Sequence, residues 1–440
     1  MTGLDPGITA LIIGVSFLVL MLTGFPVAFA MLSISILGYL VFVGPQALYT
    51  IFPVAFNTLT SDIFIAVPLF VFMASVFQVS GIGERMYDSM YKWMAGLKGG
   101  LAIGTVIICS LIAAITGLVA TGTVLMGLLA YPEMRKRGYE KKMAIGPIIA
   151  GGTLGPLIPP SVPMIIVGGL GGISTGKLFI SGIFPGLLCA FFFVLYVGIK
   201  CSLNPKLGPP IPLAERAQWK EKLVSTWGLL APIVLIILVL GGIYSGVFTP
   251  MEAGGIGAVG ALICAVVFRN LNWKNLSVAA MTTFKASAMV MWLTLTGGAF
   301  ASLCGITGIK TFIGGLLAGL PLPSIGIMLT MLIIVFIMGM FIDSVAIIMI
   351  TLPIMFPVAQ QLGYDLLLFS LLFTLCVIIG MLTPPFGYAL FYFKGIGHQD
   401  VSMKDIYDSS VPYVFLMLIV LGLCIVFPQI PLWLPNKMIK

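Results

Sequence analysis

Two apolar segments of this chain are each interrupted by a cluster of glycine, proline and hydroxyl-bearing residues that could bind ions. The first segment covers residues 143–170 and is interrupted at 151–163; the second covers 366–393 and is interrupted at 380–387. Proline has no amide hydrogen and clashes with the preceding turn, so a helix must unwind at such a cluster. Unwound backbone presents carbonyl oxygens that suit a hard cation, and the amino terminus of the next half-helix suits a carboxylate.

The interruptions belong to a longer pattern that occurs twice at a constant offset of 225 positions (357 − 132). The repeated positions are Pro132, Gly138, Tyr139, Gly155, Pro159 and Pro160, which recur as Pro357, Gly363, Tyr364, Gly380, Pro384 and Pro385. The loop around Gly138 is strongly basic, whereas the loop around Gly363 carries only Asp365. Because positively charged loops face the cytoplasm, the two copies should have opposite orientations. Such interruptions in two inverted halves are typical of secondary transporters that bind their substrate there.

The composition independently indicates an integral membrane protein. Hydrophobic residues make up 60% of the chain and charged residues 8%, and the mean hydropathy is +1.17. No soluble core could bury this much apolar surface, so the chain should cross the lipid membrane several times. The net charge of +8 comes from Lys and Arg in short loops, where it determines topology. We therefore expect no nucleic-acid partner.

The apolar stretch of residues 99–134 is interpreted as a re-entrant hairpin of two half-length helices. Basic residues of cytoplasmic type flank both of its ends, so both ends should lie on the cytoplasmic side of the membrane. A single crossing would place the two ends on opposite sides. The turn is expected at a cluster of small and polar residues that includes Thr116, Gly117, Thr121 and Thr123. Irregular backbone at membrane depth is tolerated where protein or a water-filled cavity satisfies it.

A second hairpin is expected at residues 323–362, with its polar turn at Gly339, Asp343 and Ser344. Asp343 is the one carboxylate that we place deep in the membrane, where a charge costs at least about 2.5 kcal/mol. Two roles are open for it. The carboxylate could help to bind a cation, or it could cap the second half-helix through the backbone amides.

These features predict an all-α polytopic membrane protein that is built as an inverted repeat. Each of the two repeats would contain five spans and one re-entrant hairpin. The first repeat would cover residues 1–199 and the second 227–440, joined by a cytoplasmic linker at 200–226. The predicted topology has ten spans with both termini outside, and a polar outer loop through Asn57 and Asp62.

At these motifs the chain resembles the large membrane subunit of TRAP transporters, the tripartite ATP-independent periplasmic uptake systems. The resemblance covers essentially the whole chain and rests on several short motifs together. These are residues 116–121 (TGLVAT), 136–139 (KRGY), 153–161 (TLGPLIPPS), 248–253 (FTPMEA) and 380–387 (GMLTPPFG).

The resemblance implies a Na⁺-driven elevator in the inner membrane of a bacterium, with a small four-span membrane subunit and a periplasmic solute-binding protein as partners. The cargo would be an organic acid, such as a dicarboxylate or a sialic acid. One ion site would be formed by Thr116, Gly117, Thr121, Thr153 and Gly155, and the other by Asp343, Ser344, Gly380 and Thr383. The substrate would lie between the hairpin tips, near Thr123, Pro159, Pro160, Ser161, Pro384 and Pro385.

Two other classes of protein are compatible with parts of this pattern. A stand-alone symporter or channel of the related divalent-anion fold would need no binding protein. An intramembrane enzyme is disfavoured because the spans contain neither an Asp-rich motif nor a His, Asp and Glu cluster with metal-ligand spacing. The sequence does not identify the organic acid.

Overall fold

The computed structural model describes residues 5–438, and every regular element in this range is a helix. Seven of these helices are long and apolar enough to cross a membrane. They are Asp62–Val79, Thr175–Leu203, Trp219–Tyr244, Pro250–Val267, Trp273–Ile306, Ser344–Gln361 and Met403–Val426. The chain is therefore an all-α, multi-pass membrane protein.

The order of helices in the first half recurs in the second. The first half contains α1 (Pro6–Leu22), α2 (Val27–Gly38), α4 (Asp62–Val79), α5 (Ile82–Met94), α6 (Gly100–Thr116), α7 (Val119–Lys136), α8 (Lys141–Gly152), α9 (Val162–Gly171) and α10 (Thr175–Leu203). The second half contains α12 (Trp227–Tyr244), α13 (Pro250–Val267), α14 (Trp273–Ile306), α15 (Ile309–Ala318), α16 (Ser324–Gly339), α17 (Ser344–Gln361), α18 (Leu366–Leu382), α19 (Tyr388–Lys394) and α20 (Met403–Val426). The inverted orientation of the two halves stays a prediction.

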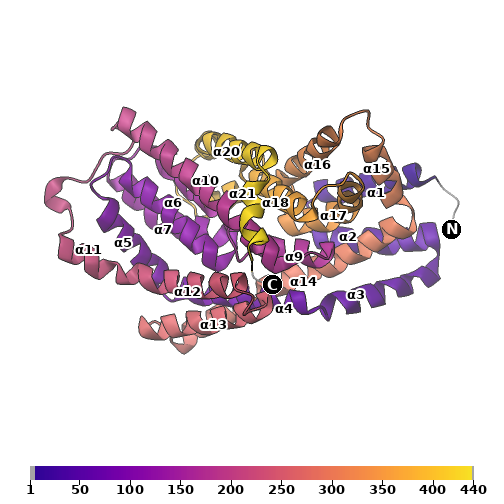
Figure 1. The fold of residues 1–440 in the computed structure, drawn as a ribbon, viewed down its shortest axis with the longest axis horizontal. Coiled ribbons are helices and arrows are strands. Elements are labelled where there is room, and N and C mark those ends of the chain that lie inside the picture. The colour runs from indigo at the N-terminus through magenta and orange to yellow at the C-terminus, as the bar shows by residue number, and fades with distance from the viewer. Residues whose placement is uncertain (1–4, 439–440) are drawn as a thin grey trace.

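A layer of long helices supports the two hairpins. Helix α4 packs against α13 and α14, and α14 also contacts α2 and α17 (Figure 1). With 34 residues, α14 is about 51 Å long at 1.5 Å per residue. The hairpin α6–α7 packs on α8, and α16 packs on α18. The two hairpin units meet where α17 contacts α9.

The structure corrects the expectation of a polar outer loop through Asn57. Residues 45–59 instead form two short helices, η2 (Pro45–Thr50) and α3 (Ile51–Leu59). The side chains of Phe52 and Phe56 are four residues apart and exposed, so they share one apolar face of α3.

The segment between the halves also contains helices, and it is bonded to the first hairpin. Its helices are η3 (Leu213–Glu215) and α11 (Trp219–Ser225), and α10 extends to Leu203. The Gly99 amide donates to the Gly208 carbonyl (2.8 Å), and the Glu140 amide donates to the Leu207 carbonyl (3.0 Å). Because Gly99 precedes α6 and Glu140 follows α7, this segment ties together both ends of the first hairpin.

A polar contact joins α7 to the loop between α19 and α20. The Tyr131 hydroxyl donates to the Asp400 carboxylate (2.7 Å), and the Arg135 guanidinium lies 3.5 Å from the same carboxylate. The hydrogen bond from Tyr131 stabilises the charged form and lowers the pKa of Asp400. His398 Nε2 lies 3.0 Å from the Gly127 carbonyl oxygen, and its ring packs on Tyr131. This contact fixes the first hairpin against the second half.

The predicted topology can be tested by labelling two loops. We expect single cysteines at Lys136 and Gln361, placed in a cysteine-free variant, to react with an impermeant reagent from opposite faces of the membrane. Both native side chains are exposed, and neither serves as a helix cap. The positive-inside rule places Lys136 in the cytoplasm. Reaction of both cysteines from the same side would contradict the inverted repeat.

Candidate functional site

The turn of the first hairpin lies directly against the interruption between α8 and α9. Gly117 ends α6 with a φ of +61°, a conformation that favours glycine. A Cβ atom at Gly117 would overlap the carbonyl oxygen of Pro160. A Cβ atom at Gly155 would lie 2.9 Å from the carbonyl carbon of Leu118. The backbone of the turn and the backbone of the interruption are therefore in direct contact, and neither glycine has room for a side chain.

Two buried hydroxyl groups at this contact have no hydrogen-bond partner within residues 5–438. They belong to Thr116, which is 1% exposed, and Thr123, which is 0% exposed. A Cβ atom at Gly152 would overlap the hydroxyl of Thr123, so this hydroxyl lies beside the end of α8. Burying a polar group without a partner costs about 1–3 kcal/mol. Hydroxyl oxygens also suit a hard cation, so both groups fit an ion site.

Two other hydroxyls predicted near the first interruption, those of Thr153 and Ser161, are already bonded. The Thr153 hydroxyl donates to the Ala150 carbonyl (2.6 Å). The Ser161 hydroxyl donates to the Pro156 carbonyl (2.6 Å) and accepts from the Met164 amide (3.3 Å). Ser161 thus caps α9. Its predicted contact with the substrate stays a prediction, and it would require these bonds to change.

The second hairpin contacts the interruption between α18 and α19 in the same manner. A Cβ atom at Gly380 would lie 2.6 Å from the Cα of Gly339, so α16 and α18 touch backbone to backbone. The Gly387 amide donates to the Met340 carbonyl (3.0 Å). The Thr383 hydroxyl donates to the Ile379 carbonyl (2.7 Å). This interruption is therefore held at the start of the second hairpin turn.

Asp343 occupies the end of the second hairpin turn and caps α17. Its Oδ1 atom accepts from the Val345 amide (2.9 Å). The residue is partly exposed. None of the ion pairs found across residues 5–438 includes Asp343. The structure thus gives Asp343 the cap role, and the carboxylate is still accessible to a ligand.

A cavity of about 220 Å³ lies between the two hairpin tips. Its wall is formed by the turn of the first hairpin, the start of α9 and one face of α14. The turn of the second hairpin and the helices on either side of the second interruption, α18 and α19, complete it. The lining residues are Gly117, Leu118, Val119, Ala120, Pro156, Val162, Pro163, Ala286, Met289, Val290, Leu293, Asp343, Ser344, Val345, Met381 and Tyr392. The amino termini of α7, α9 and α17 all contribute to this wall. Such termini favour negatively charged groups.

A second cavity, of about 460 Å³, shares Met289, Leu293 and Asp343 with the first. Its other walls are the turn between α1 and α2, one more residue of α14 and one of α19. These residues are Met21, Gly24, Phe25, Pro26, Val27, Ala28, Phe29, Trp292 and Tyr388. Asp343 therefore borders both spaces.

Of the residues predicted from sequence, Gly117, Asp343 and Ser344 line the smaller cavity. The predicted substrate residues Thr123, Pro159, Pro160, Ser161, Pro384 and Pro385 are not part of its lining. Sequence reasoning did not identify Tyr392 or the α14 residues. Tyr388 and Tyr392 lie one helical turn apart on the short helix after an interruption, and this spacing could have indicated them. The apolar face of α14 gives no comparable signal.

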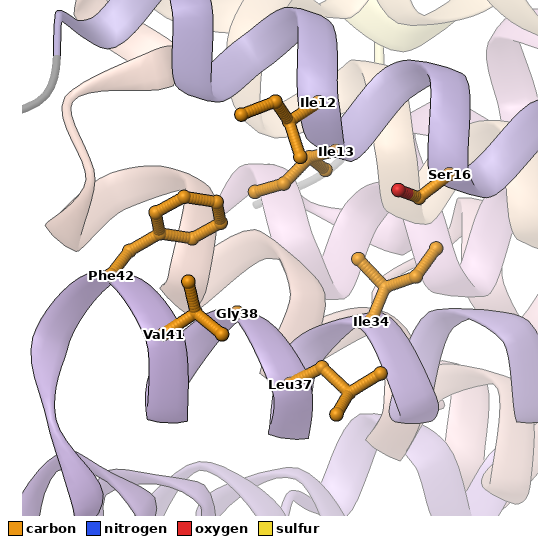
Figure 2. Close-up of a pocket in the computed structure, with 8 residues that line it drawn as sticks. All are labelled: Ile12, Ile13, Ser16, Ile34, Leu37, Gly38, Val41 and Phe42. Carbon is orange, nitrogen blue, oxygen red and sulfur yellow. The ribbon is translucent and has the colours of Figure 1, made fainter.

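A third hollow has a single polar side chain in its lining, that of Ser16. It lies between α1 and α2, and its lining side chains face one another across the gap (Figure 2). Apart from the hydroxyl of Ser16, the lining is apolar. This hollow of about 150 Å³ is therefore a gap in helix packing.

The chain is similar to known transporter proteins along most of its length. Residues 14–430 match the family described as "Tripartite ATP-independent periplasmic transporter, DctM component". The ectoine TRAP transporter large permease protein of Halomonas elongata is 30% identical over 94% of this chain and 96% of that protein. The C4-dicarboxylate TRAP transporter large permease protein of Vibrio cholerae is 28% identical over 95% of both chains.

Solved structures show the same fold at low sequence identity. The YdaH transporter of Alcanivorax borkumensis has a TM-score of 0.62 and 14% identity, with coverage of 92% of this chain and 98% of that one. The related sequences are named transporter permeases, so the protein is not an enzyme. This chain belongs to the DctM family, the large permease component of tripartite ATP-independent periplasmic transporters.

Proposed function

We propose that this chain carries an organic acid anion into the cell together with Na⁺. The observation that supports this most directly is the cavity that two hairpin tips and two helix interruptions enclose beside α14. Interrupted helices provide oxygen ligands and helix termini within the membrane, which continuous spans lack. A cavity of about 220 Å³ has the volume of roughly seven water molecules, so a small metabolite fits it.

The first Na⁺ would be bound at the contact between the first hairpin and the first interruption. The unpartnered hydroxyls of Thr116 and Thr123 support this placement, because an ion would satisfy both. Thr121, Thr153 and the backbone around Gly117 and Gly155 complete the proposed site. The second Na⁺ would be bound near Asp343, Ser344, Gly380 and Thr383, where the second hairpin touches its own interruption.

The cargo class and the partners are proposed from the relatives. Large permeases named for ectoine and for C4-dicarboxylates are similar along almost the whole chain. The proposed cargo is thus a small carboxylate that a periplasmic solute-binding protein delivers. A small four-span membrane subunit would complete the system in the bacterial inner membrane. The two hairpin units would move together past the α4, α13 and α14 layer, as in an elevator.

The decisive experiment is uptake into proteoliposomes that contain the complete tripartite system. We expect uptake of labelled substrate to require an inward Na⁺ gradient and no ATP, because the ion gradient is the only energy source in this proposal. Replacing Na⁺ with choline should reduce uptake to background. Equal uptake in choline would rule out Na⁺ coupling. Full activity without the binding protein would instead favour a stand-alone symporter.

A further inference from the structure

One face of α14 borders the cavities and continues toward the start of the helix. Met289 and Trp292 line the larger cavity, and Met289 also lines the smaller one. Lys285 precedes Met289 by four residues and Trp292 by seven, so the three side chains share one face of α14. All three are exposed. The face that borders the cavities therefore carries a lysine at its edge.

The same face carries a second lysine near the start of α14. Lys274 precedes Lys285 by eleven residues, which is about three helical turns and about 16 Å along the axis. Both lysines are exposed, as are Val278 and Met281 between them. Neither lysine forms an ion pair within residues 5–438, and α14 contains no acidic residue. We call this basic strip the lysine face; it consists of Lys274, Val278, Met281, Lys285, Met289 and Trp292.

The start of α14 is the end that we place at the cytoplasmic surface. It lies beside the end of α4, because the Asn270 side chain donates to the Ser80 carbonyl (2.6 Å). Arg269 in the preceding loop and Lys274 in the first turn are basic, and the positive-inside rule places such a loop in the cytoplasm. The lysine face therefore leads from the cavities toward the cytoplasm.

A lysine at the position of Lys285 suits a water-filled space better than lipid. Lys285 lies about 18 Å along the helix axis from Trp273, an exposed residue of a type that marks the membrane surface. Charged side chains within a transmembrane helix face the protein interior or a water-filled cavity. Met289, one turn further along the same face, borders both cavities.

We propose that the lysine face lines the route by which the anionic cargo leaves for the cytoplasm, with Lys285 as the residue that binds the departing carboxylate. The inference rests on the proposed function and adds the release route to it. A cation beside a narrow water-filled space raises the local concentration of anions there. Asp343, which borders both cavities, holds the second Na⁺ in the proposed function. Once that ion leaves, the bare carboxylate repels the cargo while Lys285 attracts it, so loss of the ion promotes loss of the cargo.

The electrostatic effect of Lys285 can be measured without the cargo. Met289→Cys, in the cysteine-free full chain in nanodiscs, serves as the reporter. The probes are two methanethiosulfonates of similar size, an anionic one with a sulfonate group and a cationic one with a trimethylammonium group. Lys285→Gln should lower the ratio of the anionic to the cationic reaction rate by at least about threefold at low salt, because it removes a positive charge one helical turn away. Lys285→Arg should preserve the ratio, and about 0.5 M choline chloride should shrink the difference.

Two further variants control this measurement. Lys220→Gln removes an exposed lysine of α11, outside the lysine face, and should leave the ratio unchanged. Phe284→Cys moves the reporter to an exposed position about 140° around the helix from Met289. It should react at least about tenfold more slowly with either probe, because a thiol in apolar surroundings stays protonated. An unreactive Met289→Cys, equal reaction at the two reporter positions, or a ratio that Lys285→Gln leaves unchanged or that Lys220→Gln lowers equally overturns the inference.

A transport measurement connects this effect to release. In proteoliposomes with the complete system, the organic acid identified by the uptake experiment is added inside, where it inhibits uptake. We expect Lys285→Gln to raise the internal concentration that halves uptake by at least about threefold, with the half-saturating concentration of loaded binding protein outside unchanged. Equal changes on both sides would give Lys285 a structural role and overturn the release route. Absence of Na⁺-driven uptake in the wild type refutes only the proposed function, because the nanodisc measurement decides independently whether this face attracts anions.

Discussion

Replacing Gly117 with alanine is expected to reduce transport by about a hundredfold while the protein still inserts into the membrane. A Cβ atom at this position overlaps the Pro160 carbonyl oxygen, which is backbone and cannot rotate away. The hairpin turn must therefore separate from the interruption that it contacts. A displacement of about 1 Å in a positioned site can lower a rate by about 10². The measurement is initial uptake at equal amounts of purified, monodisperse protein.

Gly172→Ala is the matched control for this prediction. Gly172 also has a left-handed backbone, with a φ of +63°, but no atom lies within 4 Å of the position that an added Cβ atom would occupy. An alanine in this conformation costs about 1–2 kcal/mol at either position, so both variants carry the same backbone penalty. We expect Gly172→Ala to transport within about twofold of the wild type, since its added methyl group alters no packed site. Similar losses in the two variants would attribute the effect to backbone conformation alone.

The local chemistry of proline and glycine explains why the interruptions could be placed from sequence. The gap between α8 and α9 falls on Pro156, Pro159 and Pro160, and the gap between α18 and α19 falls on Pro384 and Pro385. Proline ends a helix through its own covalent structure, independently of tertiary contacts. The turns of the two hairpins were predicted differently, from clusters of small and polar residues at Thr116–Thr123 and Gly339–Ser344, and the structure has turns there between α6 and α7 and between α16 and α17.

The side chains that complete the site depend on tertiary contacts, and the sequence did not reveal them. Met289 and Leu293 of α14 line the cavity, although the apolar sequence around them suits contact with lipid equally well. Lipid and protein interior are both apolar, so hydrophobic periodicity does not separate the two environments. Likewise, Thr116 and Thr153 look equivalent in sequence. The structure distinguishes them because Thr153 bonds to its own helix and Thr116 does not.

This difference between the threonines leads to a prediction in which folding and ion binding change in opposite directions. Thr123→Val replaces an unpartnered, buried hydroxyl with a methyl group of similar size. Without Na⁺, we expect thermal stability to be unchanged or higher, because removing an unsatisfied polar group relieves a cost of about 1–3 kcal/mol. The Na⁺ concentration for half-maximal uptake should rise at least about tenfold, which corresponds to about 1.4 kcal/mol of lost binding. Thr116→Val should behave in the same way.

Thr105→Val provides the contrast, because its buried hydroxyl already donates to the Leu101 carbonyl at 2.8 Å. Losing that bond should lower stability slightly and leave the Na⁺ dependence unchanged, since Thr105 lies about three helical turns before the hairpin tip. Thermal unfolding in choline and a Na⁺ titration of uptake measure the two quantities for all three variants. If Thr123→Val instead lowered stability and kept the wild-type Na⁺ dependence, its hydroxyl would be a structural group. The first ion site would then depend on backbone carbonyls and the remaining hydroxyls.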